Sequence, residues 1–175
     1  TDDEEYKQYF ISDGKENSNE YITEILVKKD IGKPTGITID DNNHIWFSNN
    51  HKGYIIKYNT EINKFTEYKI PLDEYEQDYV QIWSIVSNNN SIWFTEAENN
   101  LILRFNTKTS EFSKYKIPTP DSFPLQLAID NNKNIWFTET YGKKIGKIEK
   151  LTNEEYSDKI IEIEIPGEID LLGGL

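Results

Sequence analysis

Three polar residues recur at one position of a repeated run and could together hold a metal ion. Each stands three residues after a tryptophan: Asn49, Glu96 and Glu139. If these runs end at one mouth of a repeated fold, the two carboxylates and the amide would lie side by side and could bind Mg²⁺ or Ca²⁺. Alternatively, each side chain is hydrogen-bonded within its own repeat. The residues alone leave both interpretations open.

The chain has two histidines, and we expect neither to be catalytic. His44 and His51 lie in asparagine-rich turns, where contact with solvent is the ordinary state of a histidine. Cysteine is absent, which excludes disulfides, thiolate zinc sites and cysteine nucleophiles. The sequence also contains no Gly-x-Ser-x-Gly nucleophile run and no phosphate-binding glycine loop. We therefore assign no catalytic residue to this chain.

The composition excludes several classes of function. The 175 residues include 31 acidic and 19 basic side chains, which gives a net charge of -12. This charge disfavours binding to nucleic acids and to anionic membranes. No apolar run approaches the roughly 20 residues of a membrane-spanning helix. The chain begins at Thr1 rather than Met, so we expect that a signal peptide or more of a parent chain precedes it, and that the protein is extracytoplasmic or secreted.

Three segments of the chain repeat one another, and they share the run Ile-Trp-Phe. The repeats span residues 34–72, 80–119 and 124–167, and their tryptophans are Trp46, Trp93 and Trp136. The first two repeats align without a gap. Each repeat holds four short runs of β-branched and aromatic residues, separated by turns rich in Asn, Asp and Gly. Each repeat is therefore expected to form four short β-strands.

Four strands in a repeat of 40 to 50 residues predict an all-β fold, a β-propeller of four-stranded antiparallel blades. A blade cannot bury both of its faces alone, so blades stack around an axis. We expect the three repeated tryptophans to occupy equivalent buried positions between blades. Residues 1–175 would then form a single propeller domain, or a fragment of one.

The two ends of the chain are expected to form incomplete blades. Residues 1–33 resemble the back half of a preceding blade, with 6–10 as its third strand and 21–27 as its fourth, and residues 168–175 could begin a further blade. Propellers usually close with about 4 to 8 blades. We therefore expect remaining blades of a larger propeller, or a protein partner, to cover the open ends. Closure of this chain alone into a four-bladed ring is the alternative.

The repeats resemble those of the streptogramin B lyase (virginiamycin B lyase) family. The resemblance rests on the runs WFTEAENNLILRF and WFTETYGKKIGKI, on the Ile-Asp-Asn-Asn before the second of them and on the closing Ile-Pro. It implies a seven-bladed propeller that linearises a cyclic depsipeptide by elimination, with a divalent metal such as magnesium. The family's catalytic histidine lies in a Glu-Pro-His-Gly loop at the head of an innermost strand. A glutamate after Trp-Phe helps to hold the metal.

The corresponding loops of this chain lack that histidine. Thr35, Ile82 and Leu125 stand in its place, and none of these side chains can act as a base near neutral pH. The resemblance therefore implies an extracytoplasmic binding or interaction module. One alternative is a carbon–oxygen lyase whose catalytic blades lie outside this chain, and another is a structural subunit of a larger assembly.

Overall fold

The protein is built from β-strands alone in the part of the chain that the structure describes. The computed structural model describes residues 6–10, 17–18, 23–24, 33–50, 53–73, 80–152 and 154–167. Within these ranges it contains one five-stranded and two four-stranded antiparallel sheets, together with a short two-stranded sheet. None of the described residues belongs to a helix that could cross a membrane.

Each repeat forms one blade, in which every strand pairs antiparallel with the next strand of the chain. The first blade consists of β4 (Lys33–Ile39), β5 (Ile45–Asn50), β6 (Tyr54–Asn59) and β7 (Lys64–Lys69). The second consists of β8 (Ile85–Asn88), β9 (Ser91–Glu96), β10 (Leu101–Asn106) and β11 (Phe112–Lys116). The third consists of β12 (Pro124–Ile129), β13 (Ile135–Glu139), β14 (Lys144–Lys150) and β15 (Tyr156–Glu164). The predicted all-β propeller blades are confirmed.

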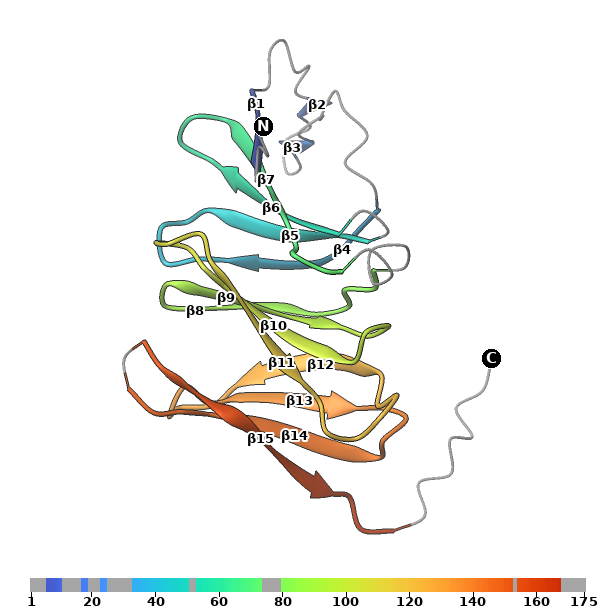
Figure 1. Cartoon of the computed structure of the whole chain (residues 1–175). Coiled ribbons are helices and arrows are strands. Elements are labelled where there is room, and N and C mark those ends of the chain that lie inside the picture. The colour runs from blue at the N-terminus through green and yellow to red at the C-terminus, as the bar shows by residue number, and fades with distance from the viewer. Residues whose placement is uncertain are drawn as a thin grey trace.

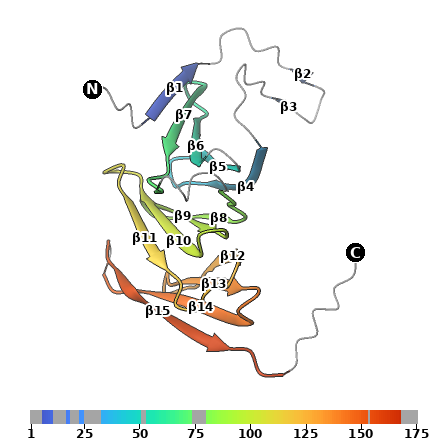
Figure 2. The ribbon, with the colours of Figure 1, turned by 45° about the vertical axis from the view of Figure 1, so that its right-hand side comes forward.

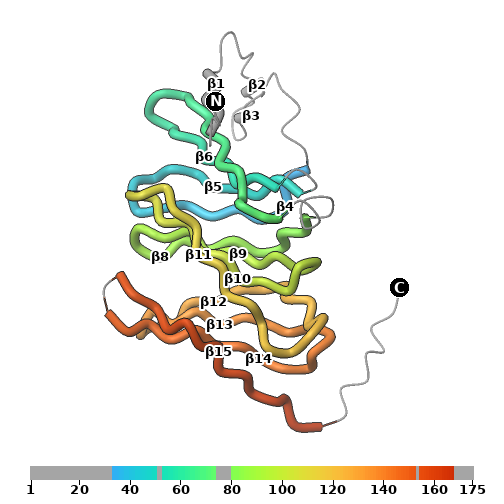
Figure 3. The backbone as a smooth tube through the Cα atoms, viewed as in Figure 1, coloured from blue at the N-terminus to red at the C-terminus, as the bar shows by residue number. Residues whose placement is uncertain are grey.

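The three blades stack in chain order and form an open arrangement. The first strands β4, β8 and β12 contact one another in turn, as the innermost strands of a propeller do. Figures 1 and 2 show the first and third blades at opposite ends of the stack, and the tube in Figure 3 shows the same order. The chain therefore does not close into the four-bladed ring that the sequence left as an alternative.

The strand nearest the N-terminus differs from the expectation. Residues 6–10 form β1 (Tyr6–Phe10), which pairs antiparallel with β7 as a fifth strand of the first blade. The sequence instead predicts that they belong to a separate, preceding blade. The outer edge of β7 offers unpaired backbone groups, and an added strand satisfies them. The strands β2 (Asn17–Ser18) and β3 (Thr23–Glu24) pair with each other, while most of 21–27 and all of 168–175 lie outside the described residues.

The hydrophobic core lies between successive blades. Trp46 faces the second blade, and its ring centroid lies 5.5 Å from that of Phe105. Trp93 faces the third blade in the same way, 4.6 Å from the ring of Tyr156. Trp136 has the same place in its own blade but is only half-buried, because no blade follows it among the described residues. The expectation of equal burial is therefore wrong for Trp136, and its position at the end of the stack is the reason.

Candidate functional site

The loops in which the resemblance places a histidine lie at the heads of the innermost strands, where the strand pairing is interrupted. The register between β4 and β5 shifts between Pro34 and Ile37. The register between β12 and β13 shifts in the same way between Pro124 and Leu127. Such bulges turn side chains out of the sheet and are common beside binding sites. The backbone geometry of these strand heads is therefore suited to a binding site, independently of which side chains stand there.

The second blade carries one more residue in this interruption than the other two. Phe94 lies opposite Ile85, although the ungapped alignment of the repeats places Ser84 there. Counted between paired residues, the connection from β8 to β9 is one residue shorter than the connection from β4 to β5. It compensates for the extra residue, so that Trp93 again aligns with Trp46. As a result, Ile82 is buried at the head of β8, whereas Trp83 beside it is 41% exposed.

A side-chain hydroxyl from the second strand of each blade holds the strand head in shape. It accepts a hydrogen bond from a backbone N–H of the head, at a distance of 2.9 to 3.1 Å. The hydroxyls are those of Ser48, Thr95 and Thr138, and the N–H groups are those of Gly36, Ser84 and Gln126. Because Ser and Thr stand just before Asn49, Glu96 and Glu139, the repeat itself encodes this brace.

The residues at the expected histidine positions help to join neighbouring blades. Thr35 is exposed, and its hydroxyl donates a hydrogen bond of 2.6 Å to the carbonyl oxygen of Ile82. The hydroxyl of Thr95 donates to the carbonyl oxygen of Leu125 at 3.3 Å. A threonine hydroxyl and two aliphatic side chains offer no group that could remove a proton near neutral pH. Groups of these three strand heads therefore link neighbouring blades by hydrogen bonds.

Glu96 is a buried brace in the second blade. Its Oε1 accepts a hydrogen bond from the backbone N–H of Gln81 at 2.9 Å, and its Oε2 accepts one from the N–H of Asn99 at 2.7 Å. Burial raises the pKa of the Glu96 carboxyl, although these hydrogen bonds oppose the rise. Both oxygens are engaged by the backbone of the same blade. This arrangement matches the alternative in which the repeated side chain is bonded within its own repeat.

Glu139 occupies the equivalent place in the third blade without those donors. Pro124 stands where the second blade has Gln81, and proline has no N–H to donate. The N–H of Gly142, the counterpart of the second donor, bonds to a backbone carbonyl instead. Glu139 is 1% exposed, and neither of its carboxyl oxygens has a hydrogen-bond partner among the described residues. It is therefore a buried acid that lacks the donors of Glu96.

The environment of Glu139 favours its protonated form. Burial raises the pKa of its carboxyl to about 7, the nearby charge of Glu162 adds to the rise, and Lys144 opposes it. Burial also acts to raise the pKa of Glu162. However, hydrogen bonds from the N–H of Thr119 at 2.8 Å and from Lys144 Nζ at 3.3 Å lower it overall. The pKa values of the two neighbouring carboxyls are thus shifted in opposite directions, and Glu162 is the one that carries the charge.

The predicted metal site of Asn49, Glu96 and Glu139 receives little support from these contacts. All three side chains are buried, and Asn49 Oδ1, opposite Pro34 in the pairing of β4 with β5, has no partner among the described residues. Glu96 is committed to backbone donors, and Lys144 supplies the cation beside Glu162. Nowhere in the described ranges do three His, Cys, Asp or Glu side chains form a group that could hold a metal. Of the three residues, Glu96 is thus already bonded to backbone N–H groups, and the metal site stays a prediction.

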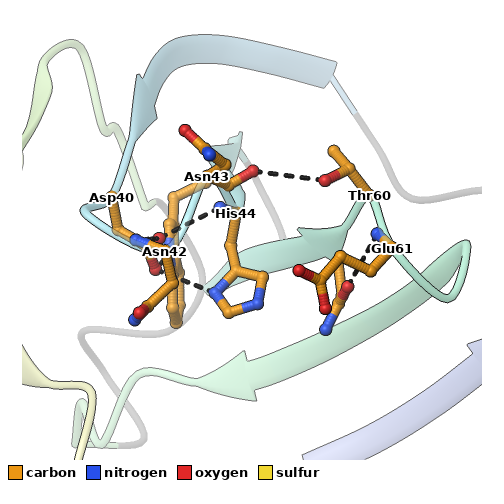
Figure 4. Close-up of polar contacts among 8 residues, drawn as sticks. Asp40, Asn42, Asn43, His44, Thr60 and Glu61 are labelled. Atoms are coloured by element: carbon orange, nitrogen blue, oxygen red, sulfur yellow. Dashed lines mark hydrogen bonds and ion pairs between the residues drawn. The ribbon is translucent and has the colours of Figure 1, made fainter.

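His44 belongs to a turn held by Asp40 (Figure 4). Asp40 Oδ1 accepts hydrogen bonds from the backbone N–H groups of Asn42 and His44, while its Oδ2 accepts one from Trp46 Nε1 at 2.8 Å. His44 Nδ1 lies 3.2 Å from the same Oδ2. Burial alone would raise the pKa of Asp40, but these hydrogen bonds lower it. His44 is half-buried rather than fully solvated.

The third blade shows that this place needs no histidine. There Asn134 stands at the position of His44, and its Nδ2 donates to Asp130 Oδ2 at 2.8 Å. Trp136 Nε1 donates to the same oxygen at 2.9 Å. An asparagine thus fills the place of His44, which indicates a structural role for the histidine. His51 lies outside the described residues.

Trp83 is a candidate site residue that sequence reasoning missed. Its large side chain is exposed at the head of β8, next to the bulge. Such a tryptophan can contact an apolar ligand. The strand heads of the two adjacent blades carry the exposed polar residues Thr35 and Gln126. Trp83 is the one tryptophan outside the Ile-Trp-Phe runs, and this departure from the repeat was the signal available.

The comparison with known families supports the resemblance that the repeats carry. The family model described as the virginiamycin B lyase family matches residues 20–168. The chain belongs to the virginiamycin B lyase family. The curated proteins contain no match to it.

Solved structures of virginiamycin B lyase agree with the family assignment. Selenomethionine-substituted virginiamycin B lyase from Staphylococcus aureus is 30% identical, with a TM-score of 0.65 over 93% of this chain and 46% of the lyase. A catalytically inactive histidine-to-alanine variant of the S. aureus lyase with quinupristin is 28% identical, with a TM-score of 0.69 over 94% of this chain and 47% of the lyase. A streptogramin B lyase structure is 27% identical, with a TM-score of 0.66 over 81% of this chain and 43% of that one. The chain thus spans about half the length of these lyases.

Proposed function

We propose that this chain is a ligand-binding propeller module of the virginiamycin B lyase family that has no lyase activity of its own. The observation that carries the proposal is the state of the three strand heads. Thr35, Ile82 and Leu125 occupy the expected histidine positions and take part in joints between blades. Glu96, at the position of the metal-holding glutamate, has both oxygens bound to backbone N–H groups. The strand heads therefore offer a surface for contacts with a ligand, but no side chain that could remove a proton from it.

The proposed binding surface consists of Trp83 with Thr35 and Gln126. These exposed side chains come from three consecutive strand heads and combine an aromatic ring, a hydroxyl and an amide. Binding sites for small molecules commonly combine apolar contacts with a few polar groups in this way. A solved relative contains quinupristin, so a cyclic depsipeptide of that type is the ligand class that we propose.

Calorimetric titration with quinupristin tests this proposal. Buried or stacked tryptophans often dominate binding, so Trp83→Ala should raise the Kd about tenfold or more. Ile62→Ala is a matched control, because Ile62 is also an exposed hydrophobic residue but lies in the turn between β6 and β7. The control should bind as the unaltered chain does. Absence of binding by the unaltered chain, or an equal loss in both variants, would contradict the proposal.

A lyase completed by blades outside this chain is the second candidate. The family membership and the half-length match to the lyases favour it, as do the retained Glu96 and Glu139. Under this proposal the isolated chain stays inactive, whereas a longer protein that contains it linearises quinupristin in the presence of Mg²⁺.

An extracytoplasmic location is a further proposal, and fractionation of cells that produce the protein would test it.

A further inference from the structure

Each blade places a cation over its repeated tryptophan, and in two blades a carboxylate accompanies it. In the first blade, Lys57 Nζ lies 5.8 Å from the ring centroid of Trp46, and Asp40 Oδ2 accepts the hydrogen bond from Trp46 Nε1. Burial lowers the pKa of Lys57, and the nearby charge of Asp40 opposes this effect. The third blade repeats the arrangement with Lys147, Trp136 and Asp130. A cation and a carboxylate thus accompany the indole in both blades.

The second blade has the cation but not the carboxylate. The guanidinium of Arg104 lies 5.9 Å from the ring centroid of Trp93. Each aspartate stands two residues after the residue that pairs with the tryptophan, and in the second blade Val86 pairs with Trp93, so that Asn88 stands there. Trp93 is completely buried, and its Nε1 has no hydrogen-bond partner among the described residues. The ion pairs within the described ranges do not include Arg104.

Arg104 lines a polar pocket between the second and third blades. The pocket lies where the turn after β8, the end of β10 and the start of β15 meet. These points are at the opposite ends of the strands from the strand heads, so the pocket is separate from the surface around Trp83. Its walls include Asn88, Ser91, Arg104, Asn106, Glu154 and Tyr156.

Arg104 and Tyr156 bring hydrogen-bond donors to this pocket. Arg104 Nε donates to Ser91 Oγ at 2.8 Å, and the hydroxyl of Tyr115 is a further neighbour of the guanidinium. A guanidinium has five N–H donors, so donors remain for a ligand. The hydroxyl of Tyr156 accepts a hydrogen bond from Asn88 Nδ2 at 2.7 Å, which leaves its own hydrogen to donate. Burial raises the pKa of the Tyr156 hydroxyl, so it keeps that hydrogen at neutral pH.

The charges at the rim of the pocket are compatible with an anion. The Glu154 carboxylate is 71% exposed and lies 3.7 Å from Lys108 Nζ, so a cation balances its charge. Asn106 Oδ1 accepts a hydrogen bond from the backbone N–H of Lys108 at 2.9 Å, which leaves its Nδ2 as a further donor. The guanidinium of Arg104 is therefore the charge in the pocket that no described ion pair balances.

We propose that this pocket binds a carboxylate group, which Arg104 and Tyr156 hold by hydrogen bonds. A planar carboxylate matches the two parallel N–H groups of a guanidinium. In the other two blades the chain itself supplies a carboxylate beside the cation and the indole. Asn88 offers an amide there, so the ligand would supply the carboxylate that the repeat otherwise contains. A small organic acid and the C-terminal end of a peptide present this same group.

Nuclear magnetic resonance of the ¹⁵N-labelled 175-residue chain tests the site. Sodium acetate replaces sodium chloride at constant ionic strength, and the Nε–H signals of Arg104 and Trp93 are followed. We expect saturable shifts at millimolar acetate and none with acetamide, which has a similar shape without the charge. The absence of a saturable shift of the Arg104 signal, or tighter binding of inorganic phosphate than of acetate, would overturn the proposal. N-acetylglycine carries the carboxylate of a peptide end, and its affinity relative to acetate distinguishes the two sources.

Three variants test whether the pocket is the binding site. Arg104→Gln removes the charge and should raise the Kd for acetate about tenfold or more. Lys147→Gln is the matched control, because it removes the equivalent cation of the third blade, and it should bind acetate as the unaltered chain does. Asn88→Asp places a carboxylate in the pocket and should prevent acetate binding, and its fold is checked by circular dichroism.

Equal weakening in Arg104→Gln and Lys147→Gln, or an unchanged Kd in folded Asn88→Asp, would show that acetate binds elsewhere and that the proposal is wrong. If Arg104→Gln does not fold, the result for Asn88→Asp decides. None of these measurements involves quinupristin, so failure of the carboxylate site and failure of the proposed function are separate results.

Discussion

Replacement of Glu139 by glutamine should stabilise the protein, and the gain should depend on pH. The pKa of the Glu139 carboxyl is about 7 in the fold, against 4.5 for an ordinary glutamate, chiefly because the group is buried. The folded state keeps a proton that the unfolded chain loses as the pH rises from 4.5 to 7. Stability is therefore lost across this window, by about 3 kcal/mol at 1.36 kcal/mol per pH unit, and the loss is complete above pH 7.

Glutamine has the shape of the protonated acid and cannot ionise. Its amide can also donate a hydrogen bond to the ionised Glu162 nearby. We expect Glu139→Gln to match the unaltered protein near pH 4.5 and to exceed its free energy of unfolding by up to about 3 kcal/mol at pH 8. Urea unfolding at a fixed protein concentration, repeated from pH 4.5 to pH 8.5, measures this difference.

Glu96→Gln is the matched control in the neighbouring blade. Glu96 accepts backbone hydrogen bonds at both oxygens, and glutamine offers only one oxygen. This control should lose about 1 to 3 kcal/mol at pH 8, because one buried N–H loses its acceptor. If Glu139→Gln is no more stable than the unaltered protein at pH 8, or if the difference does not change with pH, the account of Glu139 is wrong.

Three further substitutions test the packing of the blades, each by urea unfolding. His44→Asn should change the free energy of unfolding by less than about 0.5 kcal/mol, because an asparagine fills the same turn in the third blade; a larger loss would show a role that the turn does not explain. Gly146→Ala should cost about 1 to 3 kcal/mol, because its Cβ would lie within 2.6 Å of ring atoms of Phe137; a neutral result would contradict this packing. Trp93→Ala should cost about 3 to 5 kcal/mol and Trp136→Ala clearly less, since among the described residues a following blade covers Trp93 but not Trp136; equal losses would contradict this difference in burial.

The blades could be predicted because repeat spacing and strand composition are local properties of the sequence. The positions of Trp46 and Trp93 follow directly, since one motif in one phase implies one environment. The different burial of Trp136 depends instead on whether another blade follows, and the motif does not encode that. The pairing of β1 with β7 was missed because an unpaired edge can accept strands from either a neighbouring blade or the same one.

The candidate site was harder to predict because single residues outside the motif decide it. An ungapped alignment hid the extra residue at the head of β8, which buries Ile82 and exposes Trp83. The different states of Glu96 and Glu139 depend on Pro124, which removes a donor. That substitution was visible in the sequence, but its effect required knowing that this residue lies opposite the glutamate.

A chromatographic time course with quinupristin tests the central claim most directly. The 175-residue chain is incubated with quinupristin and Mg²⁺, and the cyclic and linear forms are separated by liquid chromatography, because elimination opens the ring without changing the mass. The absence of a base at Thr35, Ile82 and Leu125 predicts that the cyclic form persists as in a sample without protein. Protein-dependent accumulation of the linear form would contradict the account, because it would require a catalytic group elsewhere in this chain.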